Sequence, residues 1–226
     1  MHARLISYSQ PAKDAFIGVD TPEDLIAYAA RVSNPSNQIN SETAPKLLRY
    51  LIKHQHWSPF EMASICIEVE TTRDIARQLL RHRSFSFQEF SQRYADIRDL
   101  DDNFVIRETR LQDQKNRQNS IDTDDWELKM TWEGYQNSVI KAAKQAYTWA
   151  IENGIAKEQA RAVLPEGNTV SRLYVNGTIR SWIHYIELRS GHGTQKEHME
   201  LAREIAKAIT QIYPAAKEWV NEGTTN

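Results

Sequence analysis

The sequence predicts an α+β fold, or a loosely α/β one, in which a central and mainly antiparallel sheet packs against long helices in a single large domain, residues 1–226. Two observations favour this fold. The segment EMASICIEVETT alternates apolar and polar residues with a period of two, as a strand with one buried face does. Residues 126–153 instead space their apolar side chains as a long helix does. Strands and helices follow each other irregularly along the chain, without internal repeats.

Turn and capping residues mark the elements at the start of the chain. ARLISYS alternates apolar and polar residues and predicts a first strand. Thr21 as N-cap, followed by Pro22 at the first helical position, predicts a helix that ends near residues 34–35. A second helix is expected from Ser41 through ETAPKLLRYLIKH.

The strand in EMASICIEVETT and the helix after it form the best-defined pair of elements. The apolar face of the strand carries Ala63, Ile65, Ile67 and Val69. The strand gives way to a helix at residues 71–72, where TRDIARQLLRHR begins to place apolar residues at helical spacing. The polar side of this helix carries Arg77, Gln78 and Arg81 and is expected to point away from the core.

The second half of the chain opens with a polar segment and continues with further strands and helices. Residues 107–125 hold few apolar groups and no periodicity, so a mobile loop or insert is expected there. Gly154 closes the long helix, and a short helix reaches residues 164–165. TVSRLYVNGT then predicts a strand, IRSWIHYIELRS a helix, and TQKEHMELAREIAKAITQIY a closing helix before Pro214.

The composition is that of a globular protein without a general attraction for polyanions. The chain is 40% hydrophobic and 26% charged, which is ordinary for a domain that buries a core. Its 28 Lys and Arg residues nearly balance 30 Asp and Glu residues, so neither nucleic acid nor a membrane surface is expected as a partner. No apolar run approaches the roughly 18–20 residues of a membrane span, and the start of the chain lacks the apolar core of a signal peptide. The expected location is therefore cytoplasmic.

The single cysteine, Cys66, limits the chemistry that a thiol can contribute. One cysteine excludes an internal disulfide and any metal site built from several cysteines. Because Cys66 lies within the strand segment SICIEVE, a buried structural thiol is favoured over a nucleophile.

Residues 81–94, RHRSFSFQEFSQRY, concentrate four basic side chains, three serines and four aromatic residues. Guanidinium groups bind phosphate through paired hydrogen bonds and serine hydroxyls add donors, so the composition suits a phosphorylated ligand. Pairing of these arginines with Glu68, Glu70 and Glu89, together with packing of the aromatic rings, explains the composition equally well. Composition alone leaves both interpretations open.

The spacing within this segment resembles the signature of the flavin-dependent thymidylate synthases, which is Arg-His-Arg, seven residues and then serine, here Ser91. The fuller family pattern also has serine at the place of Ser86 and Arg-Tyr at the places of Arg93 and Tyr94. Gln88 departs from the family's usual asparagine and keeps the amide on a side chain one methylene longer.

Further segments extend the resemblance over most of the chain. HQHWSPFEM is similar to the family's His-x-[Ser/Thr]-Pro-Phe-Glu segment, although Met62 replaces its usual final histidine. RQLLRHR resembles Arg-Gln-x-x-Arg-His-Arg, ARAVLP resembles Ala-Arg-x-x-Leu-Pro, and IRSWIHYIELR resembles the family's helix that ends in Leu-Arg. Gln195 and Glu197 fall at the offsets that the family uses after that last arginine, while residues 107–125 are unmatched.

The resemblance implies two sets of ligand-binding residues. For FAD they are Ser58, Arg81, His82, Arg83, Glu89, Thr178, Ile179, Arg180 and His184. For dUMP they are Gln78, Arg81, Glu89, Ser91, Arg93, Arg161 and Arg189. Arg180 and His184 are four residues apart and share a helical face, although a solvated face would also explain this pair taken alone. Thr178 replaces the family's frequent asparagine.

The resemblance also implies a reaction, the reductive methylation of dUMP to dTMP by a homotetramer whose active sites lie between subunits. NADPH would reduce bound FAD, methylenetetrahydrofolate would donate one carbon to C5 of dUMP, and the flavin would supply the hydride that completes the methyl group. Arg189 is the implied catalytic residue, a cation that favours ionisation at uracil N3, although a cation satisfying carbonyls at a helix C-terminus would also explain it taken alone. The implied mechanism needs no covalent enzyme nucleophile and no metal.

Two other functions compete with this one. A metal-dependent hydrolase would draw its ligands from the histidines His54, His56, His192 and His198. The sequence lacks a His-x-x-x-His pair with an adjacent glutamate, which argues against that enzyme. A module that binds single-stranded nucleic acid would stack bases on the aromatic residues Phe85, Phe87, Phe90 and Tyr94. The nearly neutral net charge and the lack of a second basic stripe argue against that module.

Overall fold

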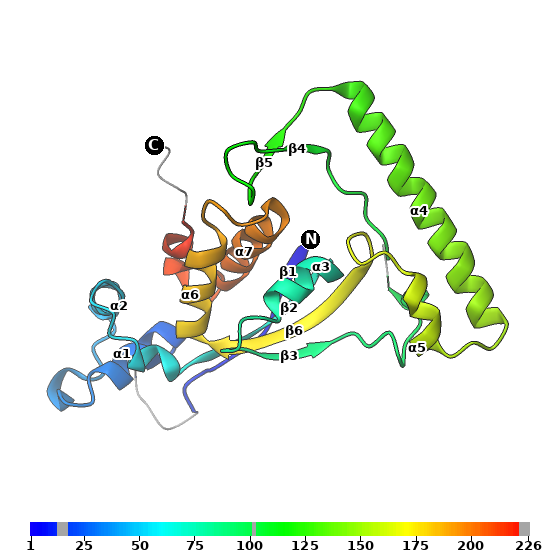
Figure 1. Cartoon of the computed structure of the whole chain (residues 1–226). Coiled ribbons are helices and arrows are strands. Elements are labelled where there is room, and N and C mark those ends of the chain that lie inside the picture. The colour runs from blue at the N-terminus through cyan, green and yellow to red at the C-terminus, as the bar shows by residue number, and fades with distance from the viewer. Residues whose placement is uncertain (13–17, 101–102, 222–226) are drawn as a thin grey trace.

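The computed structural model describes residues 1–12, 18–100 and 103–221, and it confirms the α+β fold. Its centre is a four-stranded antiparallel sheet with the strand order β1-β2-β6-β3 (Figure 1). The strands of this sheet are β1 (His2–Tyr8), β2 (Ser64–Thr72), β6 (Val170–Thr178) and β3 (Ser86–Glu89). The three strands expected from the sequence are all present. The extension of one domain over residues 1–226 stays a prediction.

Helices pack on one face of this sheet and build the core with it (Figure 1). They are α1 (Pro22–Ala30), α2 (Ala44–Lys53), α3 (Arg73–Leu79), α6 (Ile179–Arg189) and α7 (Lys196–Ile209). Helix α7 contacts β1 and β2, and α6 packs against α7. Trp182 of α6 is fully buried in this layer and donates a hydrogen bond from Nε1 to the Ile65 carbonyl at 3.1 Å. The helices are thereby fixed directly to the central strand.

The face of β2 that was expected to be apolar is confirmed as the sheet side of the core. Its residues Ala63, Ile65, Ile67 and Val69 are no more than 2% exposed. The partner strand β6 adds Leu173 and Val175, which are fully buried as well. Burial of each large aliphatic side chain stabilises the fold by about 1.5–3 kcal/mol.

The opposite face of β2 is polar and partly open. Glu68 pairs with Arg4 at 2.8 Å, and Glu70 accepts a hydrogen bond from Nε of Arg172 at 2.6 Å. Cys66 lies in β2, as expected, and it is half-buried on this face rather than buried. Burial nevertheless raises the pKa of the Cys66 thiol, which makes it a poor nucleophile at neutral pH.

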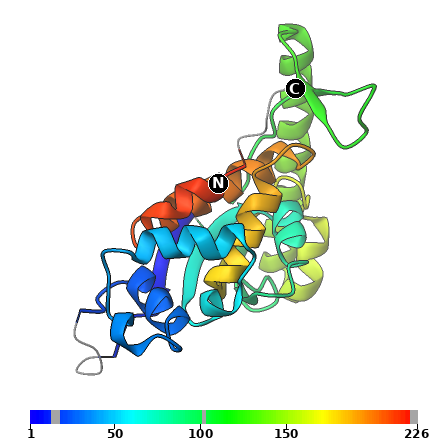
Figure 2. The same ribbon diagram turned by 90° about the vertical axis from the view of Figure 1, so that its left-hand side faces the viewer.

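Helix α4 (Trp126–Glu152) extends away from the sheet, as Figures 1 and 2 both show. The Asp125 carboxylate caps its N-terminus by accepting a hydrogen bond from the Leu128 N–H at 2.9 Å. Gly154 follows the C-terminus with a φ of 76°, a left-handed conformation that glycine adopts without strain. The long helix expected at residues 126–153 is therefore confirmed.

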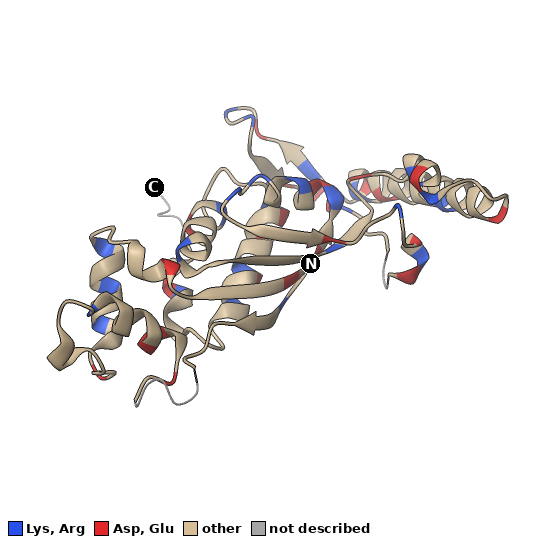
Figure 3. Cartoon of the chain, turned by 90° about the horizontal axis from the view of Figure 1, so that it is seen from below, with Lys and Arg blue, Asp and Glu red and all other residues tan. Residues whose placement is uncertain are grey.

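Charged side chains of both signs are distributed along α4 (Figure 3). Among the residues that the structure describes, no helix combines the length and the apolar composition that crossing a bilayer requires.

The segment 107–125, which was expected to lack regular structure, contains a β-hairpin. Strand β4 (Arg110–Gln112) pairs with β5 (Ser120–Asp122) in antiparallel register. Asp113 holds the connection by accepting a hydrogen bond from the Lys115 N–H at 2.8 Å. The sequence does not reveal these strands, because three residues are too short for period-two alternation, and polar groups rather than apolar burial form the turn. That the segment is a mobile loop or insert stays a prediction.

Helix boundaries also differ from the sequence expectation. Helix α1 ends at Ala30 rather than near residues 34–35, because the chain turns at Arg31. The Arg31 guanidinium donates to Oγ1 of Thr43 at 2.7 Å and so ties this turn to the start of α2. The remaining short elements are η1 (Pro35–Asn37), η2 (Ser58–Glu61), η3 (Ile97–Asp99), α5 (Lys157–Ala160), η4 (Arg161–Val163) and η5 (Pro214–Trp219).

Gly177 of β6 is required by close packing. A Cβ atom at this position would lie 2.3 Å from Cδ1 of Phe85 and 2.5 Å from Cε1. The Phe85 ring is itself packed against Trp182, with 4.4 Å between ring centroids, so it cannot move aside freely. We expect Gly177→Ala to lower the free energy of unfolding by about 1–3 kcal/mol, as overpacking of a core does.

Urea denaturation of the variant and the wild type measures this change. Gly134→Ala is the matched control, because a Cβ at that exposed position of α4 meets no atom within 4 Å. Alanine should there leave stability unchanged or raise it slightly through its helix propensity. Equal stability of Gly177→Ala and wild type would contradict the packing described.

Candidate active site

Five of the residues assigned to FAD lie around the start of α6. Arg180 and His184 are on α6, which packs against η2, the segment that begins at the exposed Ser58. Arg180 pairs with Glu61 of η2 at 2.7 Å. The His184 ring meets the Trp57 ring edge-on with 4.4 Å between centroids. Burial, and then the charge of Arg180, lower the pKa of His184 and keep its imidazole neutral at pH 7.

Thr178 and Ile179 have structural roles at the same helix end. Thr178 is the N-cap of α6, and its Oγ1 accepts a hydrogen bond from the Ser181 N–H at 3.4 Å. The Ile179 side chain is fully buried in the core. A ligand could therefore contact Ile179 only through its main chain.

Arg189, at the C-terminal end of α6, contacts His82 directly. Nε of Arg189 donates to Nε2 of His82 at 3.0 Å. Burial is the main cause that lowers the pKa of His82 to about 4, and the charges of Arg189 and Arg81 lower it further. His82 is therefore neutral at pH 7, and its Nε2 lone pair is available as the acceptor.

Arg81 and Arg83, on either side of His82, are exposed at the end of α3. In the described part of the chain neither guanidinium has an ion-pair partner. Glu68 and Glu70 pair instead with arginines of β1 and β6. Glu89 pairs with two arginines of α3. The interpretation in which those three acids neutralise Arg81 and Arg83 is therefore wrong.

Gln78 lies on the polar side of α3, as expected, and is held in a hydrogen-bond network with α7. Its Nε2 donates to Oε1 of Gln195 at 2.8 Å, and its Oε1 lies 3.2 Å from Nδ1 of His198. Gln195 in turn donates from Nε2 to Glu197 at 3.0 Å. Sequence reasoning gave His198 no part in this network.

A cavity of about 420 Å³ lies beside the outer part of α3, where Arg73, Arg77 and Arg161 converge. Burial, and then the charges of Arg77 and Arg161, lower the pKa of the Arg73 guanidinium, against the opposing effect of Glu89. Gln92 also lines this cavity; it is 4% exposed, and its Nε2 has no hydrogen-bond partner among the described residues. Glu158 and Glu166 line the same cavity, and Glu166 pairs with Arg77 at 3.1 Å. Arg161, which has no ion-pair partner in the described ranges, and the unpartnered Gln92 amide are the groups that suit an anion such as a phosphate.

The other residues assigned to dUMP lie next to this cavity. Glu89 accepts a hydrogen bond from the Ser171 hydroxyl at 2.9 Å. The Ser91 hydroxyl accepts weakly from the Arg93 N–H at 3.4 Å, and the Arg93 guanidinium pairs with Glu158 at 3.3 Å. Arg93 and Glu158 are exposed, so a stronger anion can displace this ion pair at little cost.

One chain thus carries the predicted dUMP residues in two places. Gln78, Arg81 and Arg189 lie near the end of α3, whereas Arg161 lines the cavity of about 420 Å³ that does not include Arg189. Sequence spacing identified both groups but gave no information about their separation.

The metal-hydrolase alternative is wrong. In residues 1–12, 18–100 and 103–221 no three His, Cys, Asp or Glu side chains are arranged to hold a metal ion. His54 and His56 follow α2 rather than projecting from a strand, and the His54 ring packs on Tyr50 with 4.2 Å between centroids. His198 is fully buried.

The aromatic rings that would stack on nucleic-acid bases in the alternative function do not form an accessible surface. Phe85 is 7% exposed and Phe87 packs against the core, so neither ring can receive a base. Tyr94 is exposed, but a single exposed aromatic ring of the expected set does not form a stacking surface.

Comparisons with known proteins agree with the remaining interpretation. A family model described as "Thymidylate synthase complementing protein" matches residues 16–215. The chain belongs to this family, the flavin-dependent thymidylate synthases.

Named relatives in this family align with nearly the whole chain. A probable flavin-dependent thymidylate synthase of Paramecium bursaria Chlorella virus 1 is 49% identical over 97% of this chain and 100% of its own length. A flavin-dependent thymidylate synthase of Synechocystis sp. is 46% identical over the same shares. The crystal structure of a UMP/dUMP methylase, PolB from Streptomyces cacaoi, bound with 5-Br dUMP, has a TM-score of 0.76 at 26% identity and covers 96% of this chain and 93% of that one.

The donor groups of this thymidylate synthase family member fit a flavin dinucleotide. Arg81 and Arg83 offer exposed cations for a pyrophosphate. Ser58 adds an exposed hydroxyl, and Trp57 and His184 add rings. The chemistry of these groups therefore suits FAD, although Ile179 contributes no side chain to it.

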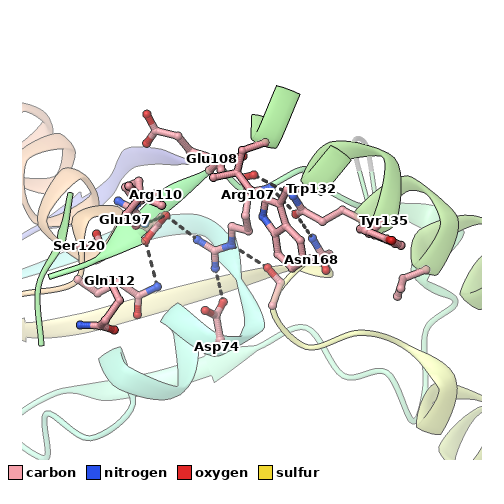
Figure 4. A pocket seen from close by; sticks show the side chains of 17 residues that line it. Asp74, Arg107, Glu108, Arg110, Gln112, Ser120, Trp132, Tyr135, Asn168 and Glu197 are labelled. Atoms are coloured by element: carbon pink, nitrogen blue, oxygen red, sulfur yellow. Dashed lines mark hydrogen bonds and ion pairs between the residues drawn. The ribbon is translucent and has the colours of Figure 1, made fainter. Parts of the chain in front are cut away.

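A further cavity, of about 700 Å³, is lined by none of the residues assigned to FAD or dUMP, although Gln195 and Glu197, which match the family's offsets, do line it. It lies between α3, the β4–β5 hairpin and α4, and Figure 4 shows Arg107 at its centre with Asp74, Glu197 and the ring of Trp132 around it. Arg107 pairs with Asp74 at 2.5 Å and with Glu197 at 3.5 Å. Gln195 and Glu197, which match the offsets that the family uses, were the sequence signal for this site.

Proposed function

We propose that this protein catalyses the reductive methylation of dUMP to dTMP, with methylenetetrahydrofolate as the carbon donor and NADPH as the reductant of bound FAD. The observation that carries the proposal is the contact between Arg189 and neutral His82, in a chain of this family. Beside this contact lie Arg81 and Arg83, which have no ion-pair partner among the described residues. The names of the viral and cyanobacterial relatives and the brominated dUMP bound by the Streptomyces enzyme support it.

Arg189 is suited to hold the uracil ring. Its Nε is occupied by His82, which leaves the two terminal amino groups without a hydrogen-bond partner in the described ranges. Methylation at C5 requires negative charge to build on the pyrimidine, and a guanidinium fixed at its N3 edge stabilises that charge. His82 orients Arg189, because a neutral imidazole accepts the Nε–H bond that a protonated one would lose.

The cavity of about 420 Å³ is suited to the phosphate of dUMP. Glu89 pairs with Arg73 and Arg77, and Glu166 pairs with Arg77 at 3.1 Å. Arg161 has no ion-pair partner among the described residues and is the cation of this group most available to a phosphate. A phosphate would pair with Arg161 and would accept a hydrogen bond from the unpartnered Nε2 of Gln92.

The exposed groups around the start of α6 and the end of α3 are suited to FAD. Arg81 and Arg83 would bind its pyrophosphate, and Arg180 with His184 would contact the rest of the cofactor from one helical face. Bound FAD supplies the hydride that completes the methyl group. The protein's part is to orient the two ligands and to hold the charge.

A homotetramer with shared sites would unite the two groups of dUMP residues. Helix α4 exposes large apolar residues that a neighbouring copy could cover, with Trp126 at 71%, Tyr135 at 66% and Trp149 at 60% exposure. Arg161 of one copy would then meet Arg189 of another.

Spectroscopy and product analysis test this function. Purified protein should be yellow, should lose that colour when NADPH is added without air, and should convert dUMP to dTMP when methylenetetrahydrofolate is supplied. Protein that takes up no flavin, even after incubation with FAD, would contradict the proposal.

The thiol should be dispensable in this reaction. Cys66 lies on the polar face of β2 and burial raises its thiol pKa, so it is unsuited to attack a pyrimidine. We expect Cys66→Ala to retain the wild-type rate of dTMP formation, measured by chromatography of the nucleotides. Loss of turnover in a folded, FAD-bound Cys66→Ala protein would show that the reaction needs the thiol.

A further inference from the structure

A chain of hydrogen bonds from Tyr185 to Glu197, all pointing in one direction, passes through Gln78. It ends at the Glu197 carboxylate, which accepts from Nε2 of Gln195 at 3.0 Å. Gln195 Oε1 accepts from Nε2 of Gln78 at 2.8 Å. Gln78 Oε1 lies 3.2 Å from Nδ1 of His198, whose Nε2 lies 3.1 Å from the Tyr185 hydroxyl.

The charge at Glu197 decides the direction of every bond in this chain. Glu197 is held as an anion by Arg110, which donates to its Oε1, and by Arg107 at 3.5 Å. A carboxylate can only accept, so Gln195 must turn its amino group toward Glu197 and its oxygen toward Gln78. The Gln78 amide is thereby fixed as well.

The other end of the chain is buried and fixes the same orientation. With Gln78 Oε1 as acceptor, His198 must carry its proton on Nδ1, and its bare Nε2 must accept from the Tyr185 O–H. His198 is fully buried and Tyr185 is 1% exposed, so no water competes for these atoms. Burial, and then the charges of Arg189 and His82, lower the pKa of His198 to about 3, in agreement with a neutral ring.

We propose that His198 and Tyr185, together with Gln195 and Glu197, are positioning residues that lock the Gln78 amide with one N–H directed to dUMP. This inference rests on the proposed function. Gln78 Nε2 has two hydrogens, and Gln195 takes one of them. The second has no partner in the part of the chain that the structure describes, and it is the donor that the substrate receives.

Calorimetric titration of dUMP into the FAD-bound protein tests the proposal through a double-mutant cycle. Removal of one orienting hydrogen bond weakens binding by about tenfold or less, so His198→Leu should raise the dUMP Kd by about that factor. In a Gln78→Ala background the same change should have almost no effect, since no amide remains to be oriented.

His198→Asn is the conservative variant. An asparagine amide places an N–H close to the position of imidazole Nδ1, so it should recover most of the affinity that His198→Leu loses. Tyr185→Phe keeps the ring and removes only the hydroxyl, and it should raise the dUMP Kd by a few-fold, about threefold. FAD content should be unchanged in all these proteins. Tyr185→Phe and His198→Asn also keep the test decisive if His198→Leu fails to fold.

The outcomes separate the two proposals. If His198→Leu raises the dUMP Kd by the same factor with Gln78 and with Gln78→Ala, His198 acts only on the stability of the fold. That result would overturn the positioning role, but it would leave dUMP binding by the wild type, and so the proposed function, intact. Affinity unchanged in Tyr185→Phe and His198→Leu would overturn the positioning role too. Wild-type protein that binds FAD but no dUMP would overturn the proposed function, and with it this inference.

Discussion

Replacing Arg189 with alanine is expected to abolish most dTMP formation while FAD remains bound. The guanidinium is fixed by its bond to His82 at 3.0 Å, and its terminal amino groups are free to face the pyrimidine. Loss of a fixed group that stabilises developing charge lowers kcat by roughly 10²–10³-fold. The exposed cations Arg81 and Arg83 do not depend on Arg189, so the flavin absorbance of the variant should match the wild type.

The variant also changes the titration of its neighbour. Burial is the largest cause of the low His82 pKa and persists in Arg189→Ala, whereas the repulsion from the Arg189 charge disappears. The pKa of His82 should therefore rise above about 4. Nuclear magnetic resonance of histidine-labelled protein measures this rise.

Two substitutions control the measurement. Arg189→Lys keeps a cation but loses the planar fork, so its rate should lie between those of the alanine variant and the wild type. Arg203→Ala removes an exposed arginine of α7 away from the site and should keep full activity. Wild-type kcat in Arg189→Ala would refute the assigned role.

Elements with strong periodicity or capping were predictable from the sequence. The apolar face of β2 follows directly from alternation, because one-residue slippage would expose Ile65 and Ile67. Helix α4 begins after Asp125, whose carboxylate caps its N-terminus, and ends before Gly154, which adopts a left-handed conformation. Both effects depend only on neighbouring residues of the chain. Local signals of this kind need no knowledge of the tertiary structure.

Elements that depend on distant partners were not predictable. Strand β3 exists because residues 86–89 pair with the free edge of β6, a partner that no local pattern in the sequence reveals. The ion pair of Arg110 with Glu197 joins residues 87 positions apart. No local pattern marks such a pair, so the cavity around Arg107 was missed.

For the candidate site, the spacing of motifs in the sequence identified which residue types are present, but it did not show where they lie relative to one another in the fold. Arg189 and His82 were assigned to different ligands from the sequence, and the structure places them in contact at 3.0 Å. Ile179 matched the family pattern, yet its side chain belongs to the core, because the first residue of α6 must face the sheet. A sequence match cannot separate a side-chain contact from a main-chain one.

The second large effect is expected for Glu197→Ala, which should destabilise the fold by about 3–5 kcal/mol at neutral pH. Glu197 and Arg110 are both 11% exposed in their side chains, and Arg107 adds a second cation to the same carboxylate. Removal of the anion leaves the largely buried Arg110 guanidinium without its ion-pair partner, whereas Arg107 keeps its pair with Asp74. Arg110 has no obvious replacement partner, since its Nη1 lacks a hydrogen-bond partner among the described residues even with Glu197 present.

The stability difference between wild type and Glu197→Ala is expected to depend on pH, and the pKa of Glu197 sets the direction of the change. Burial acts to raise the pKa of Glu197, but hydrogen bonds from Arg110 and Gln195 and the charge of Arg107 outweigh it, so the folded pKa lies below the ordinary 4.5. A folded pKa below the unfolded one contributes stability that is present above 4.5 and is lost as the pH falls through the folded value. The stability difference between wild type and Glu197→Ala should therefore shrink in acid.

Urea denaturation at neutral and at acid pH measures both effects. Glu200→Ala is the matched control, because Glu200 lies on the same helix but is exposed, and its loss should change stability by no more than about 0.5 kcal/mol. A difference between wild type and Glu197→Ala that grows as the pH falls would show that the carboxyl is held protonated. Arg110 would then require another anion, and the hydrogen-bond direction that Glu197 imposes on Gln78 would be lost.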